Sequence, residues 1–228
     1  MNERPMILVA TPFYETFKGQ YVLSLTQSML DLYDKYDIRL ATVESSQVHV
    51  NRNGLWRIAY DTKVPYLLFI DTDMLWKPQH IERLVEFDKD VVSGLCTTRK
   101  QAPSGRYHYC VYETDGTGRC RPMGSTPKVP FRCWAVGAGF MLIRRSVIVR
   151  MWEEKVKHGY PFDLMPHGLS PDKSHIESAF LGEDISFCAR LRKLGIDIWC
   201  HPDVKPKHIG EVIIGAVDEE DEEKKCQT

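Results

Sequence analysis

Hydrophobic and polar positions over the first 95 residues follow a repeated order of strand and helix. Met6–Ala10 is a short apolar run ended by Thr11-Pro12, which is typical of a strand buried on both faces. Apolar residues then recur every three or four positions, which predicts a helix with one buried stripe. That stripe contains Val22, Leu25, Met29, Leu32 and Tyr36.

The same reading continues to residue 95. It predicts strands at 38–43, 66–70 and 90–95, a helix at 50–60, and a helix from Pro78 that buries Ile81, Leu84 and Val85. Strands that alternate with helices are the order expected of βαβ units, which build a parallel sheet. A ligand site is therefore expected at the carboxyl ends of these strands.

The second half of the chain has a different pattern. Strands are predicted at 106–112 and 133–143, on either side of a turn-rich stretch at 115–118 and without a helical pattern between them, so mixed or antiparallel pairing is expected. Helices are predicted at 146–156 and 183–194, and a late strand at 196–199. Residues 158–175 form a long loop, a feature that is more often functional than idle.

Composition and charge narrow the class of protein. The chain has 228 residues, of which 43% are apolar and 27% charged, and the formal net charge is -1. These values exclude collagen-like and wholly disordered chains and disfavour a protein that holds nucleic acid by its overall charge. Six consecutive acids, 218–223, predict an acidic disordered tail over 217–228, and residues 1–216 keep 28 basic against 25 acidic side chains.

No apolar run approaches the ~18 residues that cross a bilayer. The longest is 64–70, and the N-terminal residues lack the apolar core of a signal peptide. A cytoplasmic protein without a transmembrane segment is therefore expected. The seven cysteines are odd in number and are expected to be reduced. Cys110, Cys120 and Cys133, with His108, could form a zinc cluster, but their spacing favours small buried hydrophobic side chains.

The candidate chemistry begins at Asp71-Thr72-Asp73, which follows the most apolar predicted strand. Side chains two residues apart on an extended chain point the same way, so both carboxylates can converge on one point. Mg²⁺ and Mn²⁺ prefer oxygen ligands and are commonly completed by water and substrate phosphates. A nucleoside diphosphate is the natural partner of such a site.

At these residues the chain resembles the GT-A-type glycosyltransferases, and among them the family-2-like inverting enzymes. The resemblance extends over about residues 6–209. It rests on six segments in order: 6–12, 50–53, 67–74, 91–95 with Arg99-Lys100, 136–143, and Gly182-Glu183-Asp184 followed by His208. Each segment is weak alone, and their order gives the resemblance its weight.

The resemblance implies a GT-A-type nucleotide-binding sheet, parallel in its N-terminal half and mixed in its C-terminal half, flanked by helices. It implies one glycosyltransferase domain over 1–216, with a nucleotide-binding half at about 1–95 and an acceptor and catalytic half at about 96–216. The implied activity is transfer of a sugar from a nucleotide-sugar, most plausibly a UDP-sugar, to the hydroxyl of a glycan, protein, lipid or modified nucleic acid.

The family's site residues carry over to matching positions. Asp184, beside Glu183, is implied as the general base. Asp71, Asp73 and His208 are implied as ligands of Mn²⁺ or Mg²⁺, with His201 as the alternative histidine. The implied donor site contains Thr11, Pro12, Arg52, Asp71, Thr72, Asp73, Arg99, Lys100, Gly137 and Gly139.

Other interpretations stay open at this point. Glu183 and Asp184 could simply cap a helix, and His208 could be a surface residue. A nucleotidyltransferase also joins a parallel sheet to a cation-binding acid, although the glycine-rich loop usual in that class is missing after the first strand. A GT-A-like module that binds without catalysis is the third alternative. The compact chain leaves room for a homo-oligomer or a partner chain that positions the acceptor.

Overall fold

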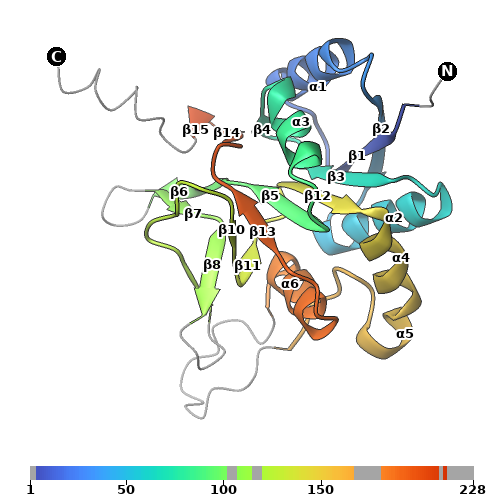
Figure 1. The fold of residues 1–228 in the computed structure, drawn as a ribbon, viewed down its shortest axis with the longest axis vertical. Coiled ribbons are helices and arrows are strands. Elements are labelled where there is room, and N and C mark those ends of the chain that lie inside the picture. The colour runs from blue at the N-terminus through green and yellow to red at the C-terminus, as the bar shows by residue number, and fades with distance from the viewer. Residues whose placement is uncertain (1–3, 102–106, 115–119, 167–180, 211–212, 215–228) are drawn as a thin grey trace.

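A mixed seven-stranded sheet with helices on both faces forms the centre of the molecule (Figure 1). The structure, a computed structural model, describes residues 4–101, 107–114, 120–166, 181–210 and 213–214. The strand order is β10-β13-β5-β12-β3-β1-β2. The predicted α/β class, with a central mixed sheet flanked by helices, is confirmed.

Three parallel strands form one side of this sheet. They are β1 (Met6–Phe13), β2 (Asp37–Glu44) and β3 (Tyr66–Ile70), with β1 in the middle. The fourth strand, β5 (Val91–Gly94), does not pair with them, because β12 (Phe140–Arg144) lies between β3 and β5 and is antiparallel to both. β13 (Trp199–His201) then pairs in parallel with β5, and β10 (Phe131–Arg132) is antiparallel at the edge.

The alternation of side chains along the strands builds two separate cores. In β1, Ile7 and Val9 face α1 (Gly19–Asp31) and α3 (Pro78–Glu86), whereas Leu8 and Ala10 face the opposite side. The opposite side is covered by α2 (Val48–Asp61), α4 (Arg145–Glu153) and α6 (Glu183–Lys193); α5 (Lys155–His158) follows α4. Because both faces are covered there, β3 and the first five residues of β1 are apolar without interruption, as the sequence indicated.

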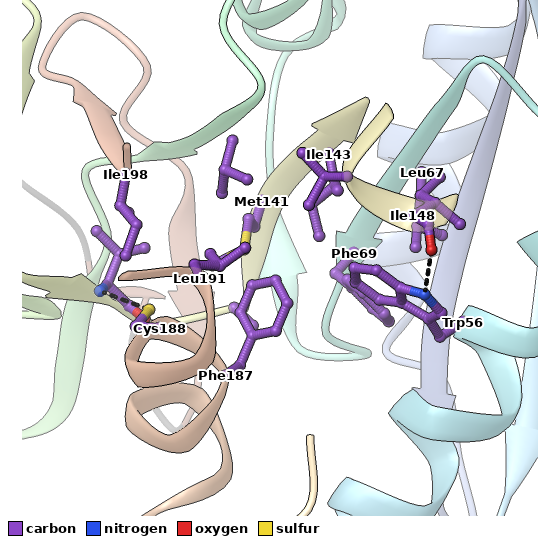
Figure 2. Packing of buried hydrophobic residues seen from close by; sticks show 14 of the residues in the cluster. Trp56, Leu67, Phe69, Met141, Ile143, Ile148, Phe187, Cys188, Leu191 and Ile198 are labelled. Carbon is purple, nitrogen blue, oxygen red and sulfur yellow. Dashed lines mark hydrogen bonds between the residues drawn. The ribbon is translucent and has the colours of Figure 1, made fainter. Parts of the chain in front are cut away.

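Figure 2 shows the second of these cores. Trp56 of α2 packs edge-on against Phe187 of α6, with 5.5 Å between ring centroids, and its indole N–H donates to the carbonyl oxygen of Ile148 in α4 at 3.1 Å. Side chains of β3 and β12, including Phe69 and Met141, close the cluster from the sheet. This packing joins α2 and α6, the two helices that carry the candidate site.

Smaller sheets surround the central one. β4 (Met74–Leu75) pairs with β14 (Lys207–Ile209), which also pairs with β15 (Ile213–Ile214). β6 (Thr97–Gln101) pairs with β7 (Tyr107–Tyr109), and β8 (Val111–Thr114) lies between β9 (Cys120–Pro122) and β11 (Ala135–Val136). The predicted strands at 106–112 and 133–143 are therefore each broken in two, at Cys110 and around Gly137–Gly139.

Two predictions about the N-terminal elements were wrong. The first strand does not end at Thr11-Pro12 but continues to Phe13, because Pro12 and Phe13 still pair with β2 after the pairing with β3 has ended. The buried stripe of α1 is only partly as predicted: Leu25 and Leu32 are buried, but Val22 and Met29 are exposed, and Ser24 and Ser28 are buried instead. Both serine hydroxyls accept hydrogen bonds from Trp76, so this helix packs through polar contacts that an apolar pattern does not reveal.

Further differences are small. Tyr36 lies beyond the end of α1, and the late strand begins at Trp199, not at Ile196. The predicted acidic tail at 217–228 and half of the predicted long loop, 167–175, lie outside the described residues. In the part of the chain that the structure describes, no helix has both the length and the apolar character needed to cross a membrane.

The six cysteines in the described residues are free thiols. Cys96, Cys188 and Cys200 are buried, but Cys110, Cys120 and Cys133 are only partly so. Among the described side chains, no three of histidine, cysteine, aspartate or glutamate are grouped so that they could hold a metal ion, so the zinc alternative has no support there.

Candidate active site

A cavity of about 360 Å³ lies where β1 and β3 end. Its lining comes from the end of β1 (Pro12, Phe13), the turn after β3 (Asp71, Thr72, Asp73), the start of α2 (Asn51, Arg52) and the start of α6 (Glu183, Asp184). Segments more than a hundred residues apart in sequence therefore meet at the carboxyl edge of the parallel strands, where the sequence predicted a ligand site.

Arg52 is the centre of this cavity's charge. Its side chain is only 2% exposed, and its guanidinium donates to Asp71 Oδ1 at 2.8 Å, to Glu183 Oε1 at 3.2 Å and to Asp184 Oδ1. The three carboxylates keep between 22% and 27% of their exposure and so face the cavity. One arginine thus ties α2 to the end of β3 and to the start of α6.

Burial opposes the charge of Arg52, but the carboxylates of Asp184, Asp71 and Glu183 outweigh it and raise the pKa of the guanidinium. Arg52 also lies over the rings of Phe162 and Phe69, at 5.6 and 6.0 Å from their centroids. A single positive charge on an aromatic floor leaves the three carboxylates with an excess of negative charge when all are ionised.

Asp184 has a pKa that is raised above the ordinary value for an aspartate. Burial raises its pKa, Arg52 lowers it, and the neighbouring Glu183 and Asp71 raise it again, with a net result of about 6. One carboxylate oxygen binds Arg52, and the other lies near Gly137. A carboxylate whose pKa is near neutrality is suited to accept and release a proton.

Two glycines between β11 and β12 make room for the carboxylates. A Cβ on Gly139 would lie 3.1 Å from Asp71 Oδ2, and a Cβ on Gly137 would lie 3.1 Å from the Cβ of Cys110 and 3.7 Å from Asp184 Oδ2. The backbone N–H of Asp71 also donates to the Gly139 carbonyl at 3.1 Å. Both glycines therefore support the acids from behind, and neither lines the cavity wall itself.

Asp73 and His208 are brought together by the pairing of β4 with β14. Asp73 immediately precedes β4, its carbonyl accepts from the Ile209 N–H at 2.7 Å, and His208 pairs with Met74. Both side chains are buried, at 6% and 9% exposure. Asp71, Asp73 and His208 provide oxygen and imidazole donors of the types that Mg²⁺ or Mn²⁺ bind, but among the described side chains these three are not grouped so that they could hold a metal ion. His201, the alternative histidine, instead packs its ring against Phe87 at 5.4 Å.

Of the remaining residues predicted for the donor site, only some line the cavity. Pro12 and Thr72 line the cavity, but Thr11 is fully buried and its hydroxyl is hydrogen-bonded to that of Tyr21, which makes it a support for β1. Arg99 and Lys100 belong to β6, and their side chains lie outside what the structure describes.

Sequence reasoning missed six residues that line the cavity: Phe13, Tyr14, Ser45, Ser46, Val48 and Asn51. Asn51 donates to the carbonyl oxygens of Phe13 and Ser45, at 3.1 and 3.0 Å, and so fixes the ends of β1 and β2 to α2. Tyr14, 59% exposed, stands at the rim. The proximity of Asn51 to Arg52 was the available signal, whereas nothing in the pattern marks Tyr14.

No protein-family model matches this chain, and no curated protein matches it in sequence. Among solved structures, it is similar to "Crystal Structure of A197 from STIV", with a TM-score of 0.51 and 17% identity over 95% of this chain and 96% of that one. This similarity shows a shared fold.

Two weaker similarities also exist. One is to a glycosyltransferase involved in glycosylation of the major capsid of PBCV-1 (TM-score 0.35, 12% identity, 68% of each chain). The other is to the inositol-1-phosphate CTP transferase of T. maritima (TM-score 0.39, 11% identity, 88% of this chain and 89% of that one). Both are too weak to bear on the activity of this chain.

Proposed function

We propose that this protein is a glycosyltransferase that depends on a divalent cation and moves a sugar from a nucleotide-sugar, a UDP-sugar in the first instance, to an acceptor hydroxyl. The observation that carries the proposal is the meeting of Asp71, Glu183 and Asp184 around Arg52, with Asp73 on the wall of the same cavity at the ends of β1 and β3. In this proposal, some of the carboxylates bind the cation, another accepts a proton, and the cavity holds the substrate.

In this proposal Asp184 is the general base. Its carboxylate accepts the proton of the acceptor hydroxyl while that hydroxyl's oxygen forms a bond to the anomeric carbon. The bond from the anomeric carbon to the phosphate oxygen breaks, and the nucleoside diphosphate leaves with that bond's electron pair. Attack opposite the leaving group inverts the anomeric centre. Arg52 keeps the Asp184 carboxylate oriented and largely ionised at neutral pH.

Asp71, Asp73 and His208 are the residues that would hold the cation, Mn²⁺ or Mg²⁺. When bound, such a cation neutralises the charge of the leaving diphosphate. The chain's own contribution is a cluster of carboxylates with only one guanidinium to offset it. That cluster favours a divalent cation and disfavours an anionic nucleotide that arrives without one.

The decisive experiment is calorimetric titration of UDP and then GDP into the protein, with and without Mn²⁺. It includes Asp73→Ala and, as a control, Asp61→Ala, which removes an exposed carboxylate from α2. Binding that needs Mn²⁺, is lost in Asp73→Ala and is kept in Asp61→Ala is the expected result. Binding of neither nucleotide under any condition would refute the proposal.

A second experiment separates transfer from the alternatives. Incubation with a panel of nucleotide-sugars and Mn²⁺ is expected to release nucleoside diphosphate, and nuclear magnetic resonance of the product gives its anomeric configuration. Release of pyrophosphate from a nucleoside triphosphate and a sugar phosphate would instead identify a nucleotidyltransferase. Tight nucleotide binding without any turnover would identify a binding module.

A further inference from the structure

A second and larger cavity lies beside β4 and the start of α3. Its volume is about 620 Å³, and its walls come from β4, the first turns of α3 and the segment 203–207 that leads into β14. Nothing in the proposed reaction uses this cavity. Its size is within the range that holds a small organic ligand.

The charge of this cavity is strongly one-sided. Four permanently cationic side chains line it, and they come from three separate segments: Lys77, Arg83, Lys205 and Lys207. Asp203 is the single acid of the lining, so the formal charge of the walls is +3 without the histidine His80. Cations from distant segments that face one hollow raise its positive potential above that of an ordinary surface.

A third cavity of the molecule provides a comparison. It measures about 400 Å³ and also contains several arginines, but three aspartates line it with them. Arg132 is paired with Asp197 at 3.1 Å, and Arg144 is paired with Asp88. That hollow is a network of surface ion pairs, whereas the walls of the 620 Å³ cavity carry a large excess of positive charge.

The floor of the positive cavity is held rigidly. Trp76, 4% exposed, donates its indole N–H to Ser28 Oγ at 3.0 Å and its backbone N–H to Ser24 Oγ at 3.3 Å. Leu75 pairs with Lys207 across β4 and β14, so that one cation is fixed by strand pairing. On the rim, the Arg83 guanidinium reaches the Asp203 carbonyl at 3.4 Å, which links α3 to the 203–207 segment. Such a cavity needs little reorganisation to receive a ligand.

We propose that this cavity binds a ligand that carries two or more phosphate charges. A guanidinium forks onto phosphate oxygens and lysines act as point charges toward them. A phosphate-bearing ligand brings two or more negative charges to these cations, whereas a single carboxylate brings only one. The apolar floor of Leu75 and Trp76 receives the carbon part of the same ligand. The inference stands independently of the proposed glycosyltransferase activity, because it uses none of its residues.

Inorganic pyrophosphate is the probe, titrated calorimetrically in the presence of EDTA. Without a divalent cation the carboxylate cavity repels pyrophosphate, so this experiment reports on the positive cavity alone. The test variant is Lys77→Ala with Arg83→Ala. The matched control is Arg57→Ala with Lys157→Ala, which removes the same charge from two other exposed positions. We expect the affinity to fall about tenfold or more in the test variant and to change less than about twofold in the control.

Absence of pyrophosphate binding by the unaltered protein, or an equal loss in both double variants, would overturn the inference. Where pyrophosphate binds, sedimentation with vesicles of phosphatidylcholine and phosphatidic acid then distinguishes the source of the phosphate. Vesicle binding that depends on Lys77 and Arg83 identifies a lipid headgroup. Pyrophosphate binding without vesicle binding identifies a soluble organic phosphate.

Discussion

Replacement of Arg52 by methionine tests whether the candidate site is held together by one buried charge. Methionine replaces the aliphatic part of the arginine side chain but has no guanidinium, so the space of that group is left unfilled. The change leaves Asp71, Glu183 and Asp184 close together with no cation between them. Breaking a buried ion pair on one side costs ~3–5 kcal/mol. Because the carboxylates keep 22–27% exposure and remain partly solvated, we expect the low end, about 3 kcal/mol at neutral pH.

The loss is expected to depend on pH with a definite sign. The pKa of Asp184 is raised to about 6, so its protonated form contributes stability at low pH that is lost as the pH rises through that value. Arg52 lowers this pKa, and its removal raises the pKa further. The difference between variant and unaltered protein is therefore larger at about pH 8 than at about pH 5, where Asp184 holds its proton in both and only Asp71 and Glu183 lose their partner.

Urea unfolding followed by circular dichroism at both pH values measures this effect. Arg57→Met, one turn further along α2, is the control, because Arg57 is 68% exposed and its pair with Asp61 contributes within about 0.5 kcal/mol. Two results would refute the role of Arg52 as the buried cation that holds the three acids together. One is an Arg52→Met variant whose free energy of unfolding falls by less than about 1 kcal/mol at high pH. The other is a variant whose free energy of unfolding falls by the same amount at both pH values.

Three further predictions concern the site and its support. Turnover is expected to rise with pH through about 6 as Asp184 loses its proton. The variant Asp184→Asn is expected to lower kcat about 10²–10⁴-fold, while calorimetry still detects nucleotide binding. Gly139→Ala is expected to weaken binding of UDP with Mn²⁺ in the same calorimeter, because its Cβ would meet Asp71 Oδ2 at 3.1 Å, whereas Gly124→Ala meets nothing within 4 Å and should bind normally. Ser28→Ala is expected to cost about 1–3 kcal/mol in urea unfolding, because it leaves the Trp76 indole N–H buried without its acceptor.

Each of these has a contrary outcome. A flat pH profile between about 5 and 8 would remove Asp184 from the role of base. Equal nucleotide affinity in Gly139→Ala and the unaltered protein would mean that Asp71 does not need its present position. A Ser28→Ala variant as stable as the unaltered protein would show that the indole finds another partner.

The elements predicted best from sequence are those whose apolar residues are unbroken. Tyr66–Ile70 is correct at both ends, and the helix from Glu183 begins where expected, because a buried strand and an acidic helix start leave local marks. The stripe of α1 was misplaced for the opposite reason. Ser24 and Ser28 are buried by their bonds to Trp76, and that partner is 48 to 52 residues away.

The residues of the candidate site that follow a local sequence pattern were predictable, but the contacts between distant segments were not. The two acids of Asp71-Thr72-Asp73 could be found from their place after an apolar strand. That Arg52 joins them to Glu183 and Asp184 depends on how α2 and α6 pack around Trp56, which no local pattern contains. The positive cavity was not predicted at all, because its cations lie in segments that are each unremarkable alone.

The position of β12 between β3 and β5 has a consequence for synthesis of the chain. β5 ends at Gly94, but its two neighbours in the sheet, β12 and β13, begin only at Phe140 and Trp199. During translation, β5 therefore leaves the ribosome with both of its hydrogen-bonding edges open and waits for at least 46 further residues. Val91 and Val92 are fully buried in the finished fold, and the strand that carries them has no sheet partner through this interval. The nascent chain has a window in which strand-to-strand aggregation competes with folding, and a chaperone that shields this segment would raise the yield of native protein.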